Sequence, residues 1–466
     1  MIETQEQQFS AFLQEAFARH GDCAFFRGVS YSAYLEQLRS NYRSWNRYGI
    51  GKDDIIVLSD HKTAANLLDI LTALYYGHRI CLIHNQLFLE HALEQLAVFG
   101  TAEPLADGRP AAVIRCEEPV LPDLIASTSG TTGLPNLVQH TAAGILANIT
   151  AIETYLRPDE ADVIYLQRNP VYLSVLTGEV LLGIKRGCCF FLPESSLNPE
   201  KLIADIREQH AAVLVSVISY FDTVLPFLKR NADSLQSLKY LQFVGEGGRI
   251  GLIDDLSVIL PHTDIIIGYG LTEAGPRISY ASCREMKMKQ NLVGRLLPDV
   301  RARIVGDSGE DLPCGAKGTV ELASRSMMLG YVGKESVQDW FRTSDYGWKD
   351  ENGFLYIQGR LDDIAIRNGV KVPLVSIEQG LMQSGLISCA CAFQRTGKKG
   401  SIRVEAAVLS ERSAPDLETD LMKWCRSNLD EILWPQKIYR LESFPHRPNG
   451  KLDRRAVQAA AAGANT

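Results

Sequence analysis

Residues 127–136 read Ser-Thr-Ser-Gly-Thr-Thr-Gly-Leu-Pro-Asn, and the apolar residues Leu124, Ile125 and Ala126 come just before them. Hydroxyl side chains and glycines make up most of this stretch. Serine and threonine supply short hydrogen-bond donors, and glycine lets backbone N–H groups approach a ligand closely, as phosphate-binding loops require. The stretch therefore predicts a phosphate-binding loop whose ligand is a nucleoside triphosphate.

A surface turn of serine, threonine and glycine has the same composition, so the stretch alone leaves that alternative open. It does not have the spacing of a P-loop NTPase. Gly130 and Gly133 lie too close together, and no Lys-Ser or Lys-Thr pair follows them. A P-loop NTPase is therefore not expected.

Size and composition describe an ordinary globular protein. The chain has 466 residues, of which 46% are hydrophobic and 22% charged. It is long enough for more than one core, since domains typically have roughly 100 to 200 residues. The net charge of −7 and the pI near 5.8 argue against nucleic acid or an anionic membrane surface as the main partner.

The ten cysteines are scattered, and none belongs to a Cys-x-x-Cys pair. We therefore expect reduced, mostly buried thiols and no zinc site or disulfide framework. The polar start Glu3–Gln8 does not resemble a signal peptide, and the longest apolar runs, such as 211–219, are too short to span a bilayer. These features predict a cytoplasmic enzyme without a membrane span.

The N-terminal part alternates strand and helix patterns. Asp54–Leu58 is predicted as a buried strand, Thr63–Tyr75 as an amphipathic helix and Ile80–Ile83 as a second strand. This βαβ order predicts an α/β fold with sheets covered by helices. Residues 101–122, rich in proline, glycine, alanine and acidic groups, are predicted to form a loose connection.

The pattern changes twice towards the C-terminus. Residues 291–330 have short strand patterns with Gly and Pro turns, which predict a small β-barrel-like unit. The composition breaks near residues 359–363, and mixed strand and helix patterns follow. We predict a large N-terminal domain of residues 1–359 and a small α+β C-terminal domain of residues 360–466.

The phosphate-loop stretch resembles a signature of the acyl-adenylate-forming superfamily, which includes acyl-CoA synthetases, aryl-acid ligases, luciferases and nonribosomal peptide synthetase adenylation domains. The signature is [Ser/Thr]-[Ser/Gly]-Gly-[Ser/Thr]-Thr-Gly-x-Pro-Lys, and only its last position differs, where this chain has Asn136. Three more segments resemble family motifs in the same order, so the resemblance covers nearly the whole chain. These segments are Tyr269–Glu273, Thr343–Arg360 and Pro448–Arg454.

The resemblance implies an ATP site. Tyr269 would lie against the adenine, Thr272 would donate a hydrogen bond to the α-phosphate, and Glu273 would bind Mg²⁺. Mg²⁺ favours one or two carboxylates together with phosphate oxygens, and a hydroxyl at the α-phosphate stabilises charge that develops during attack. Asp345 would accept hydrogen bonds from both ribose hydroxyls, and Arg360 would reach the ribose or a phosphate.

The C-terminal motif implies that Lys451 is the adenylation lysine, whose ammonium would bridge the attacking carboxylate and the α-phosphate. Asp362 is at the position of the family's interdomain hinge, around which the small domain would move between the two half-reactions. Ile366 differs from the lysine that many relatives have beyond the hinge.

The resemblance assigns three sets of site residues. The catalytic residues are Lys451, Thr272 and Glu273. The nucleotide-binding residues are Thr128, Ser129, Gly130, Thr131, Thr132, Gly133, Glu246, Gly247, Tyr269, Gly270, Asp345, Ile357 and Arg360. The residues of the substrate pocket are Tyr172, Leu173, Gly245 and Gly275.

The predicted function is ATP-dependent activation of a carboxylic acid as acyl-AMP, followed by transfer to a thiol. Amino-acid-activating relatives have an Asp that aligns within Val171–Ser174, a stretch without a carboxylate here. An unpaired buried ammonium is costly, so a non-amino acid, aryl or fatty, is favoured. CoA and a phosphopantetheinyl carrier protein both stay open as the acceptor. The alternatives are a free-standing amino acid adenylation enzyme and, because of Asn136 and Ile366, a degenerate non-catalytic homologue.

Overall fold

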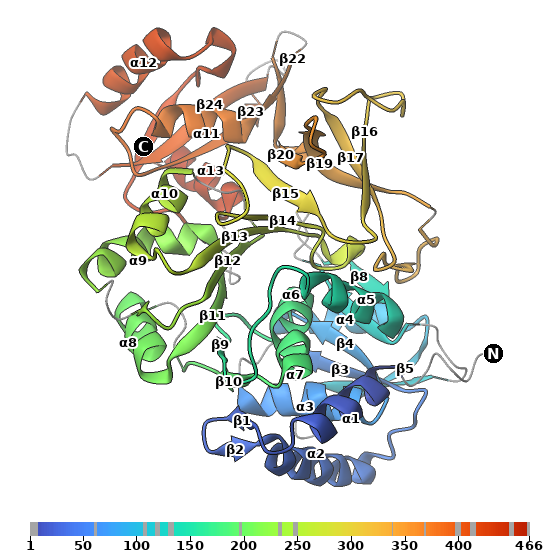
Figure 1. Ribbon diagram of the computed structural model, residues 1–466. Helices are drawn as coiled ribbons and strands as arrows, with labels where there is room; N and C mark the ends of the chain where they lie inside the picture. Colours follow the sequence, from blue (N-terminus) through green and yellow to red (C-terminus); the bar gives the residue numbers. More distant parts are fainter. Residues whose placement is uncertain are drawn as a thin grey trace. The chain divides into compact units, whose positions relative to one another are not determined.

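A computed structural model of the chain (Figure 1) describes residues 8–59, 63–105, 110–116, 122–128, 135–194, 198–231, 235–245, 250–337, 339–367, 370–396, 402–410, 416–446 and 452–463. Spatial contacts divide the chain into two compact units. The first unit is Met1–Ala302 with Leu322–Phe341, and the second is Arg303–Glu321 with Arg342–Thr466.

The larger sheet of the first unit has a parallel centre and antiparallel edges. Its strand order is β15-β14-β13-β12-β11-β9-β10-β1-β2. Neighbours from β13 to β1 run parallel, whereas β14, β15 and β2 pair in antiparallel fashion. In this order the strands are Leu292–Leu296, Ser279–Ser282, Asp264–Tyr269, Tyr240–Val244, Ala211–Ser216, Val163–Tyr165, Cys189–Phe191, Ala24–Phe26 and Val29–Ser30.

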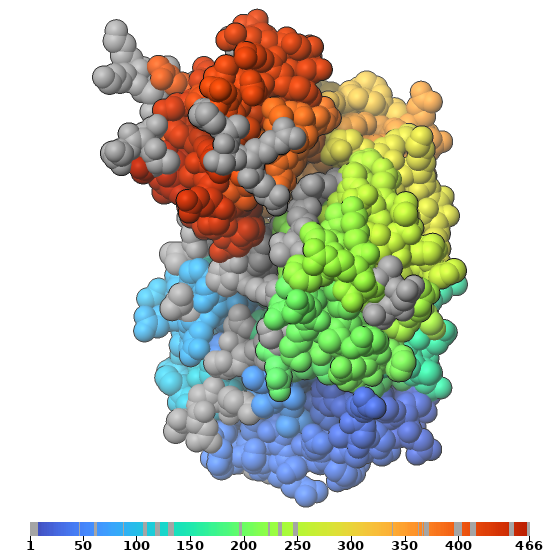
Figure 2. Space-filling view, turned by 90° about the vertical axis from the view of Figure 1, so that its left-hand side faces the viewer, coloured from blue at the N-terminus to red at the C-terminus, as the bar shows by residue number. Residues whose placement is uncertain are grey.

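Three helices cover one face of this sheet: α8 (Pro199–Gln209), α9 (Ile218–Arg230) and α10 (Ile250–Ile259). On the side drawn in Figure 2 they form a continuous green to yellow-green surface of the first unit. Their apolar sides pack inward, as amphipathic helices do on a sheet. Because the central strands run parallel, their carboxyl ends meet at one edge of the sheet.

The second sheet of the first unit has seven strands in the order β18-β8-β7-β4-β3-β6-β5. In this order they are Gly330–Tyr331, Leu137–His140, Leu124–Ser127, Arg79–Ile83, Ile55–Ser59, Ala112–Cys116 and Gly100–Pro104. β5 and β6 lie where the sequence predicted a loose connection, so that expectation was wrong. β6 forms because Val113 and Ile114 are buried and pair with Ile55 and Ile56 of β3.

The predicted βαβ unit is confirmed. β3 and β4 pair in parallel, and α3 (Ala64–Tyr75) connects them. The Oγ1 of Thr63 accepts the N–H of Asn66 and caps the start of the helix. Gly77 follows the helix with φ of 76°, a conformation that favours glycine at a helix end.

Helices between the two sheets complete one continuous apolar core. Leu82 of β4, Ile149 and Phe190 of β10 all lie in it, so both sheets share it. The apolar run Val171–Lys185 is typical of one helix, but in the structure a π-helical stretch interrupts the helix. Besides α3 and the α8–α10 layer, the described helices of the first unit include α1 (Gln8–Arg19), α2 (Tyr31–Trp45), α4 (Leu89–Leu96), α5 (Ala142–Ile152), α6 (Leu173–Val175), the π-helical η3 (Leu176–Leu181) and α7 (Leu182–Arg186).

The second unit has its own apolar core. Strands β16, β17, β19 and β20 lie side by side in that order, a two-stranded ladder joins β21 and β22, and a further sheet has the order β23-β24-β25. The strands are Arg301–Val305, Gly318–Ala323, Phe341–Lys349, Leu355–Arg360, Ile364–Arg367, Val370–Pro373, Cys389–Thr396, Ile402–Leu409 and Ile438–Leu441. The helices are α11 (Leu374–Met382), α12 (Leu417–Asn428) and α13 (Arg454–Gly463).

The mixed α/β class predicted from the sequence is confirmed. The second compact unit takes in residues 303–321 and 342–359 as well as the residues after 360. The functional boundary near residue 360 stays a prediction. Among the helices that the structure describes, none is long and apolar enough to cross a membrane.

Candidate active site

The segment predicted to hold the α-phosphate and Mg²⁺ begins at the carboxyl end of β13. Tyr269 is the last residue of this strand, and the short 3₁₀ helix η5 (Thr272–Ala274) follows. The imidazole Nε2–H of His140 donates to the carbonyl oxygen of Thr272 at 2.8 Å. Burial lowers the pKa of His140 to about 4, so the ring is neutral near pH 7. β8 thereby fixes the backbone of Thr272.

Glu273 is held by neutral hydrogen-bond donors of the first unit. The phenol of Tyr331 donates to Oε1 of Glu273 at 3.0 Å, and the backbone N–H of Met328 donates to its carbonyl oxygen at 2.9 Å. A phenol orients a carboxylate without cancelling its charge. This arrangement fits a carboxylate that binds a hard divalent cation such as Mg²⁺.

Two glycines of this segment are required by close packing. A Cβ atom at Gly270 would lie 2.1 Å from the carbonyl oxygen of Pro276. Gly275 has φ of 81°, and a Cβ atom there would lie 2.5 Å from Oγ of Ser326. The packing explains why glycine occurs at both positions, whereas contacts of Gly270 with the nucleotide and of Gly275 with the substrate stay predictions.

The described ends of the phosphate-loop stretch are bonded to each other. The N–H of Thr128 donates to the carbonyl oxygen of Asn136 at 2.9 Å, and the N–H of Asn136 donates to Oγ1 of Thr128 at 3.2 Å. The ammonium of Lys334 donates to Oδ1 of Asn136 at 3.1 Å. The predicted site residues outside the described part of the chain are Ser129, Gly130, Thr131, Thr132, Gly133, Glu246, Gly247 and Lys451.

The predicted ribose segment lies in the second unit, in the ladder of β19 and β20. Asp345 and Arg360 are directly opposite partners, and Ile357 is opposite Gly347. Asp345 is buried, and its N–H donates to Oγ1 of Thr343 at 3.0 Å. The ladder therefore brings the predicted carboxylate and guanidinium residues together across adjacent strands. Their contact with a ribose stays a prediction.

For the predicted hinge residue Asp362, and for Ile366 where many relatives have a lysine, the structure describes the backbone only. Asp362 lies in the 3₁₀ helix η6 (Leu361–Asp363), directly after β20. Ile366 lies in β21, opposite Lys371 of β22. A short irregular turn between two ladders is compatible with a hinge, and the hinge role of Asp362 stays a prediction.

The predicted pocket residues of the first unit lie at strand and helix ends. Tyr172 precedes α6, and its ring centroid is 5.6 Å from that of His84. Leu173 is buried at the first position of α6, and Gly245 follows β12 with φ of 82°. Their contact with a substrate stays a prediction.

Sequence reasoning missed a charged cluster beside this helix. Glu179 lies in the π-helical η3 with its side chain fully buried, and Arg168 donates to its Oε1 at 2.6 Å. Arg277 is also buried, and a Cβ atom at Gly178 would lie 3.0 Å from one of its terminal nitrogens. Burial lowers the pKa of Arg277, with a smaller opposing contribution from Glu179. A buried acid inside an apolar helix pattern was the signal that the sequence offered.

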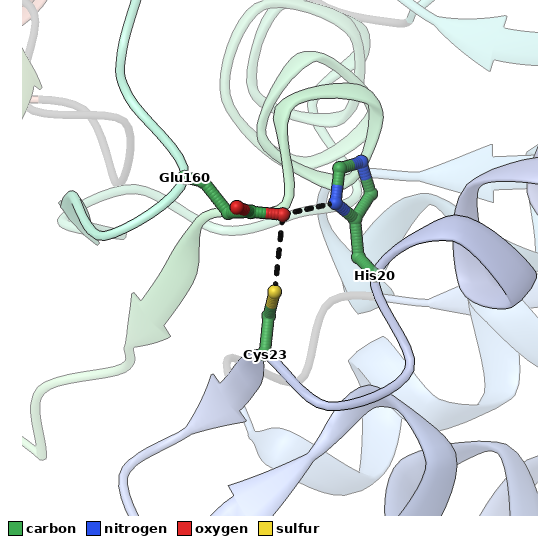
Figure 3. A group of neighbouring side chains, drawn as sticks. All are labelled: His20, Cys23 and Glu160. Atoms are coloured by element: carbon green, nitrogen blue, oxygen red, sulfur yellow. Dashed lines mark hydrogen bonds and ion pairs between the residues drawn. The ribbon is translucent and has the colours of Figure 1, made fainter.

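A second cluster lies at the end of α1 (Figure 3). Oε1 of Glu160 lies 2.7 Å from Nδ1 of His20 and accepts the thiol proton of Cys23 at 3.1 Å. Nε2 of His20 lies 3.2 Å from the carbonyl oxygen of Lys185. Burial and Glu160 raise the pKa of Cys23 to about 11, so the thiol keeps its proton. Three side chains are fewer than a structural zinc site uses, and we assign these contacts a structural role.

Comparisons with known proteins agree with the motifs. A family model described as "AMP-binding enzyme" matches residues 108–332. A D-alanine–D-alanyl carrier protein ligase of Streptococcus agalactiae is 27% identical over 354 residues, which cover 71% of this chain and 69% of that protein. A feruloyl-CoA synthase of an Amycolatopsis species is 25% identical over 465 residues, covering 94% of this chain and 89% of that protein.

The fold has close structural counterparts as well. A solved anthranilate CoA ligase in complex with anthranoyl-AMP superposes with a TM-score of 0.83 at 16% identity, over 98% of each chain. Residues 108–332 therefore match the AMP-binding enzyme family, and the ligase relatives support the resemblance of the chain to the acyl-adenylate-forming superfamily. The chain is an AMP-forming ligase, as its motifs predicted.

Proposed function

We propose that this enzyme uses ATP and Mg²⁺ to activate a non-amino carboxylic acid, aryl or fatty, and then transfers the acyl group to a thiol. In the first step an oxygen of the substrate carboxylate attacks the α-phosphorus, and pyrophosphate leaves with the electron pair of the broken P–O bond. In the second step the thiolate sulfur attacks the acyl carbon, a thioester forms, and AMP leaves.

The charge balance beside the predicted pocket carries this proposal. Glu179 lies in the helical stretch that starts with Leu173. Two guanidinium groups, those of Arg168 and Arg277, lie near its carboxylate. Glu179 is the single carboxylate of residues 171–181 in the sequence, and Arg168 already donates to it. A substrate ammonium here would have to displace that ion pair and lie beside excess positive charge, which is costly in a buried site.

The described contacts also support the adenylation step. Glu273 is oriented by Tyr331, a neutral partner that does not cancel its charge, so it would suit Mg²⁺ as a ligand. The backbone contact from His140 holds Thr272 so that its hydroxyl can donate to the α-phosphate. Mg²⁺, when bound, neutralises charge on the phosphates. Lys451 would supply the remaining cation at the attacking carboxylate.

Named relatives support a thiol acceptor of either kind. The D-alanine relative is named for a carrier protein, and the feruloyl relative is named for CoA. A CoA thiol and a phosphopantetheinyl carrier protein present the same thiol arm, so either is compatible with the proposal.

Exchange of labelled pyrophosphate into ATP, measured with a panel of aryl, fatty and amino acids, tests the proposal. We expect exchange with an aryl or fatty acid and none with amino acids. Exchange with amino acids alone would overturn the non-amino assignment in favour of an amino acid adenylation enzyme. Absence of exchange with every acid would favour a degenerate, non-catalytic homologue.

Lys451 provides the matching variant. Lys451→Ala is expected to lower exchange by about three orders of magnitude or more, because it removes the cation at the transition state. Lys423→Ala is the control, since Lys423 is an exposed lysine of α12 in the same unit, paired with Asp420. Near-normal exchange by Lys451→Ala with circular dichroism like that of the control would contradict the assigned role.

A further inference from the structure

Position 136 lacks the positive charge that the phosphate-loop signature has, but the fold brings another one there. Lys334 is 198 residues away in sequence, and its Nζ lies 3.1 Å from Oδ1 of Asn136. The contact follows from strand pairing. β18 pairs with β8, and the N–H of Val332 donates to the carbonyl oxygen of Leu137, the residue after Asn136.

The same lysine connects to the predicted metal ligand. Nζ of Lys334 lies 5.0 Å from the ring centroid of Tyr331, within the range of a cation–π contact. The phenol of Tyr331 in turn donates to Glu273 at 3.0 Å. A chain of contacts thus connects Asn136 to Glu273. It runs through the ammonium of Lys334 and the ring and hydroxyl of Tyr331.

A purely structural role explains little of this arrangement. Lys334 is exposed, and a hydrogen bond from an exposed lysine to a neutral amide adds little stability after solvent screening and lost side-chain entropy. An ammonium has three donors, and a polyphosphate beside the loop would be a much stronger acceptor than an amide.

We propose that Lys334 supplies the cation that position 136 lacks and binds the β- and γ-phosphates of ATP. Asn136 positions the ammonium through its side-chain oxygen, and the ring of Tyr331 supports it from the side nearer Glu273. The ligand class is the polyphosphate part of a nucleoside triphosphate. This inference rests on the adenylation proposed above.

Binding of ATP and of AMP, measured by calorimetry without any acid, separates this role from a structural one. Lys334→Ala is expected to weaken ATP binding about tenfold to a hundredfold and to change AMP binding less than about twofold, because AMP lacks the β- and γ-phosphates. In the exchange assay the KM for ATP should rise more than kcat falls. Lys317→Ala is the matched control, since Nζ of Lys317 also lies 5.0 Å from an aromatic centroid, that of Trp348.

A rescue experiment makes the assignment specific. Asn136→Lys introduced into Lys334→Ala returns the missing charge to the loop and should restore most of the ATP affinity. Unchanged ATP affinity in Lys334→Ala, equal losses for ATP and AMP, or failure of the rescue would each overturn the inference. Normal exchange with unaltered ATP binding in Lys334→Ala rejects this inference alone. Absence of exchange with every acid, together with selective ATP loss, rejects the proposed acyl activation instead.

Discussion

Glu273 and Glu179 are carboxylates of the same unit, and their hydrogen-bond partners differ in charge. Glu273 accepts a hydrogen bond from a neutral phenol, that of Tyr331, and is partly exposed. Glu179 is fully buried and accepts from the guanidinium of Arg168 at 2.6 Å, with Arg277 close by. The neutral phenol does not cancel the charge of the first carboxylate, as the proposed Mg²⁺ ligand requires, whereas the charge of the second is compensated by Arg168.

The comparison shows that the charge of the partner decides whether a carboxylate is already compensated inside the protein. A neutral donor leaves the formal charge of the carboxylate in place, so most of its attraction for Mg²⁺ is retained. A guanidinium fork satisfies a carboxylate and fixes it in place, so that removal of either partner leaves a buried charge without compensation.

The largest effect is expected from Glu179→Gln. This change removes the negative charge and leaves the buried Arg277 and the largely buried Arg168 without this carboxylate. Breaking a buried ion pair in this way typically costs about 3–5 kcal/mol. Urea denaturation followed by tryptophan fluorescence should show a lower free energy of unfolding by roughly that amount.

A double change is the control for that measurement. Arg168→Met with Glu179→Met replaces both charges by apolar side chains of similar length, and it should be less destabilising than Glu179→Gln alone. If Glu179→Gln were as stable as the unaltered protein, the ion pair would not be the compensated partner that the comparison requires.

In contrast to Glu179→Gln, Glu273→Gln is expected to cause a large loss of activity and little loss of stability. The amide keeps a hydrogen bond to Tyr331 but provides no charge for Mg²⁺, so pyrophosphate exchange should fall by about a hundredfold or more. Higher Mg²⁺ concentrations should recover part of the rate.

Glu285 offers a matched control for this change, because it too accepts a hydrogen bond from a tyrosine, Tyr280, at 2.9 Å. Glu285→Gln should leave both the exchange rate and its Mg²⁺ dependence unchanged. Equal losses in the two variants would mean that Glu273 affects activity through folding and not through a metal.

The sequence predicted those parts of the molecule whose chemistry is contiguous in the chain. Thr272 and Glu273 are neighbours in one motif, and the βαβ unit from β3 to β4 has local periodicity, so both could be predicted. β5 and β6 could not. Their composition indicates a loop, and they form strands because β3 provides hydrogen-bond partners and a buried face for Ile114.

Contacts between segments that are distant in the chain could also not be predicted from the sequence. Arg277 meets the helix that carries Glu179 only because β13 and β14 return the chain to it, and the pattern of either segment alone gives no sign of the other. Lys334 reaches Asn136 through the pairing of β18 with β8. The sequence therefore shows that position 136 lacks the lysine of the signature but gives no means of finding Lys334, its proposed replacement.

The smallest effect is expected from Tyr331→Phe, and it tests how much of the behaviour of Glu273 depends on orientation. The change removes the phenol hydroxyl that holds Oε1 but retains the ring beside Lys334, so the charge of Glu273 and the cation–π contact both persist. Loss of a single hydrogen bond to a charged group corresponds to about 1.5–3 kcal/mol at most, and replacement by water reduces this cost at a partly exposed site. Exchange should therefore fall by about three- to tenfold, with a weaker dependence on Mg²⁺ than in Glu273→Gln. Tyr280→Phe, which removes the equivalent phenol at Glu285, should leave exchange unchanged. A loss in Tyr331→Phe as large as that in Glu273→Gln would show that the phenol is required to bind the metal and not only to orient its ligand.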